Sequence, residues 1–158
     1  MQFAAHLDGA SEANPTGSSA FGDALVTLDA AAFTVAVHVT FSGLSAPATA
    51  AHIHCCTTVP LTGTSAVFVG FPTVGAPPTF PQATSGTYDN TFTLASASFA
   101  TLLTGIQDGK SYVNIHNSPF PLGEIRGFLA PVPEPVTLAL MLGGLGLVGA
   151  VAGRRRAA

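Results

Sequence analysis

Strict alternation of apolar and polar residues is the feature that most limits how this chain can fold. Phe33, Val35, Val37, Val39 and Phe41 fall on one side of an extended segment, and the residues between them fall on the other. A period of two indicates a strand with one buried face, which is typical of antiparallel sheets. Similar patterns predict seven further strands, at residues 2–7, 22–29, 50–55, 66–71, 87–94, 112–117 and 124–129.

The order of these segments predicts one all-β domain over residues 1–130. Eight short strands separated by turn-forming residues favour an antiparallel β-sandwich, immunoglobulin-like or superoxide-dismutase-like, or a flattened barrel. One helix is expected at 96–106, because serines stand near its start and Asp108-Gly109 follows its end. Four prolines within residues 71–82 predict a long irregular loop.

The C-terminal segment follows a different pattern. Pro133-Glu134-Pro135, within a short linker at 131–135, is followed by an apolar run at 136–153 and then by a basic cluster at 154–158. A helix over the apolar run would be roughly 25 Å long, close to the roughly 30 Å core of a bilayer. The run therefore predicts a short transmembrane helix, with the basic tail in the cytoplasm and the preceding domain outside.

These three parts, in this order at the C-terminus, closely resemble the PEP-CTERM sorting signal of Gram-negative bacteria. The resemblance implies that Pro133, Glu134 and Pro135 form the sorting motif. It also implies an exported chain, anchored in the inner membrane as a precursor and then brought to the cell surface or exterior by an exosortase-type enzyme. We expect the mature protein to lack the tail; the alternative is a plain membrane anchor. Since residues 1–6 lack the segments of a signal peptide, we expect the true start or a cleaved leader to lie upstream of Met1.

The charge of the domain excludes one class of partner. Before Arg154 the only basic residues are Lys110 and Arg126, against eight acidic residues, so residues 1–153 carry a net charge of −6. Nucleic-acid binding relies on clustered Lys and Arg side chains that neutralise phosphates. We therefore expect no nucleic-acid partner.

Three histidines fall on two predicted strands at positions that favour a metal site. His52 and His54 share one face of their strand, and His116 lies on the polar face of another. Neutral imidazoles from neighbouring strands suit copper or zinc. The alternative is a hydrogen-bonded polar cluster that braces the two strands. His38 would be a fourth ligand only if its strand were adjacent, and His6 is expected on the surface.

Cys55 and Cys56 follow directly after the first two histidines. Adjacent Cα atoms are about 3.8 Å apart, which is below the usual disulfide range that starts at about 4.4 Å. Three states stay open. They are a vicinal disulfide, which an oxidising exterior favours slightly, a Cys56 thiolate that joins the histidines as a ligand, and two inert thiols.

Glu124 and Arg126 alternate with Ile125 and so share one face of their strand. A structural ion pair, with each other or with a neighbouring strand, is the favoured interpretation. Arg126 could instead hold a carboxylate through its bidentate fork. The sequence contains no Ser-His-Asp order, phosphate-binding loop or four-cysteine zinc pattern, and we predict no catalytic residues.

Three motifs together resemble the chordin-type (CHRD) domain. They are residues Ala51 to His54, Tyr112 to His116 and Gly123 to Gly127, and the likeness runs from about Phe3 to Leu129. The resemblance implies a β-sandwich-like extracellular module, whose role in microbes is largely undefined. Cys55 departs from the glycine that often follows the His-x-His motif in this family.

These observations predict a non-enzymatic module of the cell surface or extracellular matrix. Its expected role is adhesion, matrix building or ligand binding, with a polysaccharide or protein partner. The alternative is a copper- or zinc-binding β-sandwich with redox or metal-storage activity at His52, His54 and His116. The His-x-His pair also resembles copper-zinc superoxide dismutases. However, a net charge of −6 opposes the positive field that guides superoxide, so redox catalysis is the weaker form of this alternative.

Overall fold

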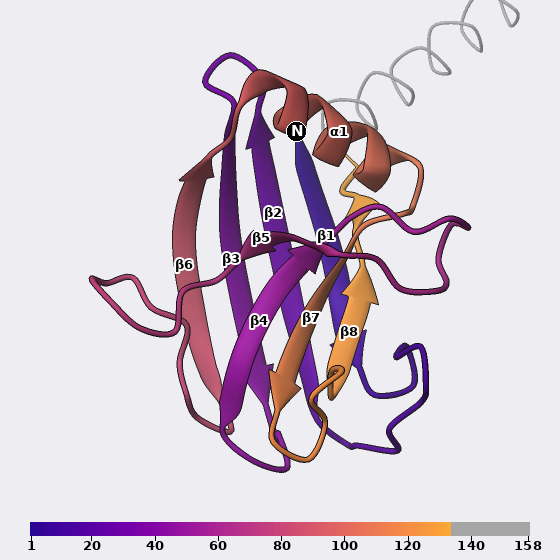
Figure 1. The fold of residues 1–158 in the computed structure, drawn as a ribbon, viewed down its shortest axis with the longest axis vertical. Coiled ribbons are helices and arrows are strands. Elements are labelled where there is room, and N and C mark those ends of the chain that lie inside the picture. Colours follow the sequence, from indigo (N-terminus) through magenta and orange to yellow (C-terminus); the bar gives the residue numbers. More distant parts are fainter. Residues whose placement is uncertain (134–158) are drawn as a thin grey trace, which may run out of the picture.

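The computed structural model describes residues 1–133, which form nine strands and one helix (Figure 1). The bounds are β1 (Gln2–Asp8), β2 (Phe21–Asp29), β3 (Thr34–Ser42), β4 (Ala48–His54), β5 (Val67–Gly70), β6 (Gly86–Thr93), α1 (Ser96–Gln107), β7 (Tyr112–Asn117), β8 (Ile125–Phe128) and β9 (Ala130–Pro131). Every strand pair is antiparallel. The expected antiparallel, mostly β class is therefore confirmed. The short β9 has no counterpart among the predicted strands.

In the described part of the chain, no helix is long and apolar enough to cross a membrane. The transmembrane helix predicted at 136–153 and the basic tail predicted at 154–158 lie outside the described residues.

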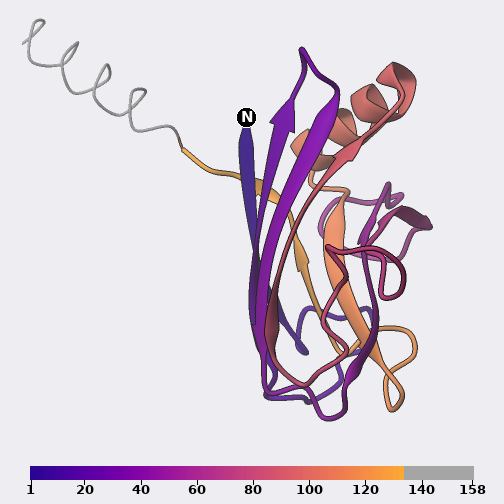
Figure 2. The same ribbon diagram turned by 90° about the vertical axis from the view of Figure 1, so that its left-hand side faces the viewer.

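The strands form one curled sheet. Their order is β5-β4-β7-β8-β1-β2-β3-β6, with β9 paired to β1. Because the sheet curls, β1, β2 and β3 form one layer, and β4 and β7 face them across the core (Figure 2). The expected sandwich is present as two facing layers, but these are halves of a single sheet. Alternation shows which residues face inward and not which strands are neighbours, so the sequence could not reveal this continuity.

The two layers join where β8 meets β1. Their pairing is limited to Asp8 opposite Arg126. Gly127 permits the approach, since a Cβ at this position would overlap the carbonyl oxygen of His6. A glycine inside a strand commonly marks such a close contact between backbones.

The interior of β3 follows the predicted pattern, with one exception. The four apolar residues expected to face inward from Val35 to Phe41 are all buried. Phe33 differs, because β3 begins at Thr34 and Phe33 has a φ of 52°. The positive φ turns the chain and ends the alternation there. The ring of Phe33 instead contacts Phe99 of α1, with 5.7 Å between centroids.

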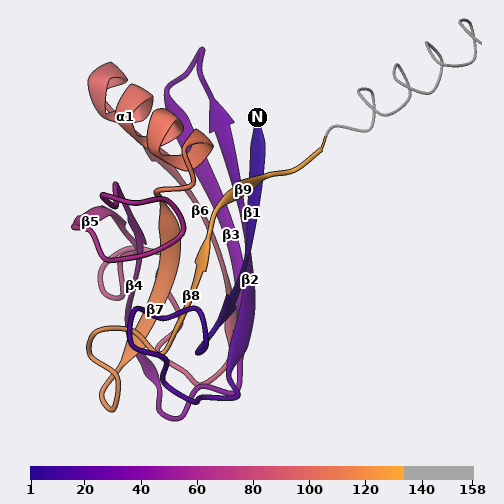
Figure 3. The same cartoon turned by 90° about the vertical axis from the view of Figure 1, so that its right-hand side faces the viewer.

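Helix α1 covers one end of the core (Figure 3). Its residues Phe99, Leu102 and Ile106 are buried. The irregular segment predicted between β5 and β6 is present, and its Phe80 is 1% exposed and stacks on Phe41 at 5.2 Å. Apolar side chains thus fill the space between the layers. The polar residues of β4 and β7 are left on the face that points away from the core.

Candidate metal centre and adjoining cavity

The outward face of β4 and β7 carries the three candidate histidines. Alternate residues of these strands, such as Ile53, are fully buried in the core, so the histidines point to the opposite face. The register places His116 opposite Ala50, two residue pairs along the strand from His52 and on the same face. His54 and His116 are nevertheless only 8% and 9% exposed, because loops cover this face.

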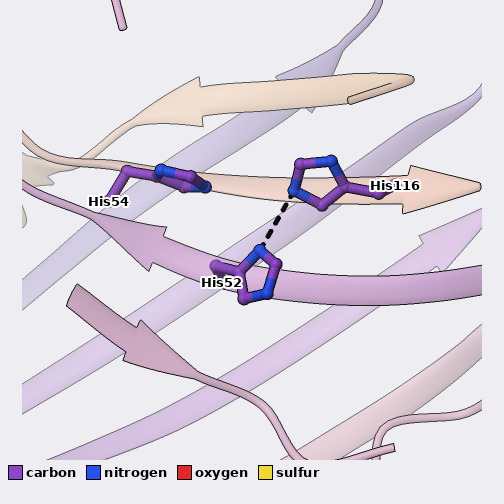
Figure 4. A group of neighbouring side chains, drawn as sticks. All are labelled: His52, His54 and His116. Atoms are coloured by element: carbon purple, nitrogen blue, oxygen red, sulfur yellow. Dashed lines mark hydrogen bonds between the residues drawn. The ribbon is translucent and has the colours of Figure 1, made fainter. Parts of the chain in front are cut away.

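The three imidazoles converge (Figure 4). Nδ1 of His52 lies 3.1 Å from Nε2 of His116. One ring nitrogen from each of His52, His54 and His116 lies within 4.8 Å of the other two. Two nitrogens 3.1 Å apart, each bound at about 2.05 Å to one copper or zinc ion, subtend an angle of about 98° at the ion. The structure thus brings together the histidines that the sequence indicated, and the facing nitrogens of His52 and His116 are at a spacing that a single ion can bridge.

Backbone carbonyls fix the orientation of two of the rings. Nδ1 of His54 lies 2.9 Å from the carbonyl oxygen of Ser65, and Nδ1 of His116 lies 3.1 Å from that of Pro121. A carbonyl oxygen only accepts, so each Nδ1 carries the proton and each Nε2 keeps its lone pair. Nε2 of His54 is buried and has no hydrogen-bond partner among the described residues. Histidines that bind metals commonly donate their second nitrogen to a carbonyl in this way.

Burial keeps the three rings neutral. The loss of water contact, together with the neighbouring His52, lowers the pKa of His116 to about 4. Burial also lowers the pKa of His52 and of His54, and the charge of Arg126 adds to the effect on His54. Neutral imidazole is the form that binds a metal ion. The cluster therefore has the protonation state that a metal site requires.

A cavity of about 500 Å³ adjoins the histidines. Its lining includes His54 and His116 together with Glu12, Asn114 and Arg126. Nδ2 of Asn114 donates to Oε1 of Glu12 at 2.9 Å. Nε of Arg126 lies 3.9 Å from Oε2 of Glu12, which is too far for a hydrogen bond. Burial raises the pKa of Glu12 to about 7, although the charge of Arg126 opposes this rise.

Comparison with known families accounts for both parts of the chain. A family model described as the CHRD domain matches residues 3–129. The chain belongs to the CHRD domain family. A second model, described as a PEP-CTERM protein-sorting motif, matches residues 131–156. Both family resemblances of the sequence are therefore confirmed. No curated protein and no solved structure matches this CHRD domain chain.

The sorting motif implies a destination for the CHRD domain. PEP-CTERM motifs are recognised by exosortase-type processing enzymes, and they imply export, passage to the membrane and sorting to the cell surface. An exosortase-type enzyme is therefore a partner of this chain.

Glu124 of the CHRD domain does not pair with Arg126, contrary to one expected arrangement. Its carboxylate is fully buried and accepts a hydrogen bond from Oγ of Ser18 at 2.6 Å. It also accepts from the backbone N–H and the hydroxyl of Ser45, both at 3.0 Å, and from Nδ2 of Asn117. Glu124 lies just before β8, outside the regular strand, so the alternation that put it on one face with Arg126 does not apply. It connects two loops to β7.

Arg126 is held mainly by backbone oxygens. Nη1 donates to the carbonyl of Gly63 at 2.7 Å, and Nε donates to the carbonyl of Ser11. The guanidinium lies over the ring of Tyr112, 4.9 Å from its centroid. The carboxylate that forms its ion pair is that of Glu12, at 3.9 Å. The predicted structural ion pair is thus long, and its acidic partner comes from the loop between β1 and β2.

The cysteine pair lies beyond the end of β4. The sulfur atoms of Cys55 and Cys56 are within bonding distance of each other and face the backbone of Thr101 in α1. Gly105 of α1 provides the space, since a Cβ there would overlap both sulfurs. Cys56 does not join the histidine cluster. The thiolate-ligand interpretation fails because the strand ends at His54, so alternation does not continue to Cys56.

The other two histidines lie on the opposite layer of the CHRD domain. His38 belongs to β3, whose neighbours are β2 and β6, so it is not a fourth ligand. Its Nδ1 lies 2.7 Å from Asp89, and Nδ1 of His6 lies 2.9 Å from Asp23. The expectation that His6 lies on the surface agrees with its side-chain exposure of 59%.

Sequence reasoning missed the groups that support the site. The carbonyls of Ser65 and Pro121 give no signal in a sequence, because every residue carries one. Glu12 is separated from Asn114 by 102 positions. The available signal was an acid two positions before the turn-forming residues at 14–17, which indicates a loop but not what the loop covers.

Proposed function

We propose that this chain is a non-enzymatic binding module of the cell surface, whose CHRD domain binds one copper or zinc ion through His52, His54 and His116. The observation that carries the proposal is Nε2 of His54. This atom is buried and unpartnered in the described structure, and one ring nitrogen of His54 lies within 4.8 Å of a nitrogen of each of the other two rings. A buried acceptor without a partner costs about 1–3 kcal/mol, and a metal ion would remove that cost.

The chemistry of the donor set agrees with this ion. Three neutral imidazoles favour copper or zinc over calcium or magnesium, which prefer oxygen ligands. With His116 protonated at Nδ1, the 3.1 Å contact is a hydrogen bond donated by Nδ1 of His52. Metal binding would require the other neutral tautomer of His52, with the proton on Nε2 and the lone pair on Nδ1, so binding near neutral pH should release no net proton.

The non-enzymatic part of the proposal rests on charge. Lys110 and Arg126 are the basic side chains of residues 1–133. A site that turns over an anion such as superoxide gains from a positive field around it, and this domain is acidic. Metal-dependent ligand binding or metal storage fits the acidic domain better than redox turnover does.

Surface sorting supports a wider role in adhesion or matrix building, with a polysaccharide or protein partner outside the cell. A module delivered to the surface meets such partners directly. This role can be tested in the native host by replacing Pro133, Glu134 and Pro135 with alanines. We expect the variant to remain in the membrane fraction at full-length mass, and cell adhesion or matrix yield to fall. Normal surface delivery of the variant, or unchanged adhesion and matrix without delivery, would contradict the proposal.

The metal proposal is tested by titration of zinc and copper into metal-free, full-length protein that carries no histidine tag. We expect one ion per chain with submicromolar affinity. His54→Ala should weaken binding by at least about 100-fold, since it removes a ligand rather than a supporting group. His38→Ala is the matched control, because His38 is also on a strand but lies on the other layer. Equal loss in the two variants, or no binding at micromolar metal, would refute the site.

A further inference from the structure

The cavity beside the histidines has features of a ligand site that the proposed metal centre does not use. Four buried side-chain atoms of the described residues lack a hydrogen-bond partner, and three of them belong to residues that line this cavity. They are Nε2 of His54, which the proposed metal centre uses, and Oγ of Ser65 and Oδ1 of Asn114, which it does not use. Asn114 is 2% exposed, and its Nδ2 is already used by Glu12. Its Oδ1 is therefore a buried acceptor without a donor. Such atoms are rare in native structures.

Arg126 brings a positive charge to the same cavity. Arg126 is 3% exposed. The two carbonyls that accept its hydrogen bonds orient the guanidinium but do not neutralise its charge. Glu12 lies beyond hydrogen-bonding distance from its Nε. A buried cation gains most from a carboxylate that accepts two parallel hydrogen bonds. The cavity thus favours a ligand that carries a carboxylate.

The register of the sheet places the two polar groups side by side. Asn114 of β7 is paired directly with Arg126 of β8. The Cβ atoms of such pairs are about 5 Å apart. A carboxylate and a hydroxyl on adjacent carbons can therefore reach the guanidinium and the amide oxygen together.

The rest of the wall is mainly apolar. It includes Ala13, Pro119, Phe120, Pro121 and Leu122. A volume of about 500 Å³ with apolar walls and a few convergent polar groups is typical of sites for small organic molecules. The ligand is expected to carry an apolar substituent next to its polar end.

We propose that this cavity binds a small α-hydroxycarboxylate with an apolar substituent. Its carboxylate accepts hydrogen bonds from Arg126, its hydroxyl donates to Oδ1 of Asn114, and its substituent packs against the wall around Phe120. The site shares His54 and His116 with the proposed metal centre but does not need the ion. It can therefore be tested without metal, and its failure would be distinct from failure of the metal proposal.

The first test compares three related molecules by calorimetric titration into the full-length protein in mild detergent, after removal of metals with a chelator. Mandelate has both polar groups, phenylacetate lacks the hydroxyl, and 1-phenylethane-1,2-diol lacks the carboxylate. We expect mandelate to bind at millimolar concentration or below. Phenylacetate should bind about threefold to tenfold more weakly and the diol at least about tenfold more weakly. Absence of mandelate binding, or equal binding of all three, would overturn the proposal.

A steric variant locates the binding. Ala13→Trp adds a large side chain at an exposed position of the cavity wall and should weaken mandelate binding by at least about tenfold. Ala10→Trp is the matched control, because Ala10 is exposed on the same loop but does not line the cavity. Loss in Ala13→Trp alone supports the site. Wild-type affinity in Ala13→Trp would overturn it. The ligand series on the unaltered protein decides the question if Ala13→Trp fails to fold.

Discussion

The two layers of the sheet both carry histidines on their outward faces, but these histidines differ in solvent exposure and in hydrogen-bond partners. On the layer of β1, β2, β3 and β6, His6 and His38 each pair with an aspartate, and the four side chains are 49–71% exposed. On the layer of β4 and β7, His54 and His116 are less than a tenth exposed. They donate to backbone carbonyls and lie next to other histidines rather than carboxylates.

The difference comes from the loops and not from the strands. The same alternation turns all these histidines away from the core. Segments of the loops that follow β1, β4 and β7 line the cavity over the second layer. An exposed ion pair contributes little in water, whereas a covered imidazole loses its hydration, and an unpaired nitrogen then becomes a binding group. The loops therefore determine on which outward face the histidines can act as binding groups.

Glu124→Ala should produce the largest loss of stability, because Glu124 ties the loops that follow β1 and β3 to β7. The substitution removes the shared acceptor of Ser18, Ser45 and Asn117 and empties a fully buried position. We expect the free energy of unfolding to fall by about 3–5 kcal/mol, because several hydrogen bonds to a buried carboxylate are lost, each worth about 1.5–3 kcal/mol. Urea denaturation measures it. Asp89→Ala, on the exposed face, is the control and should cost less than about 1 kcal/mol. Similar losses in the two variants would mean that the two faces do not differ in this way.

Gly127→Ala tests the junction that makes the two layers one sheet. The added Cβ would overlap the carbonyl oxygen of His6, which belongs to backbone and cannot turn aside. We expect a loss of about 3 kcal/mol from the strain of separating β8 from β1. Gly70→Ala in β5 is the matched control, since the nearest atom to its Cβ would be 3.9 Å away. Thermal or urea unfolding compares them, and a neutral Gly127→Ala would argue against the close approach of the strands.

The sequence predicted the direction of side chains along each strand, which is a local property. It did not predict the contacts between distant segments, which depend on the tertiary structure. Alternation identified the inward residues of β3 and the outward direction of His52, His54 and His116. It failed at Phe33, where a positive φ turns the chain. It also failed at Cys56, where the strand has ended. The pairing of β8 with β1 and the position of Glu12 in the cavity depend on contacts between distant segments, for which one sequence has no periodic signal.

His116→Gln tests the burial of the histidines on β4 and β7 through the pH dependence of stability. The pKa of His116 is lowered from 6.5 to about 4, so the unfolded chain binds the proton more tightly in this interval. Stability should therefore rise with pH between about 4 and 6.5 and be lost as the pH falls, by up to about 3 kcal/mol for this group. His116→Gln should remove that part of the slope, with His52 and His54 contributing the rest. Urea titrations of metal-free protein at pH 4.5 and 7 measure it. His38→Gln is the control, and an equal change in both would show that burial is not the cause.

Glu12→Gln should change the slope of stability against pH in the opposite direction. The pKa of Glu12 is raised from 4.5 to about 7, so here the folded protein binds the proton more tightly. This group therefore stabilises the fold least above about pH 7 and lowers stability as the pH rises from about 4.5 to 7. Between pH 5 and 8 the loss is about 2.5 kcal/mol for a shift of this size. Glutamine keeps the acceptor for Nδ2 of Asn114 and cannot ionise.

We accordingly expect Glu12→Gln to match the wild type near pH 5 and to exceed its stability at pH 8, measured by urea denaturation at both values. Asp23→Asn is the matched control, because Asp23 is an exposed acid of the other layer with a side-chain exposure of 69%. If Glu12→Gln were instead less stable at pH 8, the ionised carboxylate would be the required counter-charge of Arg126. The long contact of 3.9 Å would then be a stabilising ion pair, and the cavity would already hold its anion, which removes the reason for an external carboxylate at Arg126.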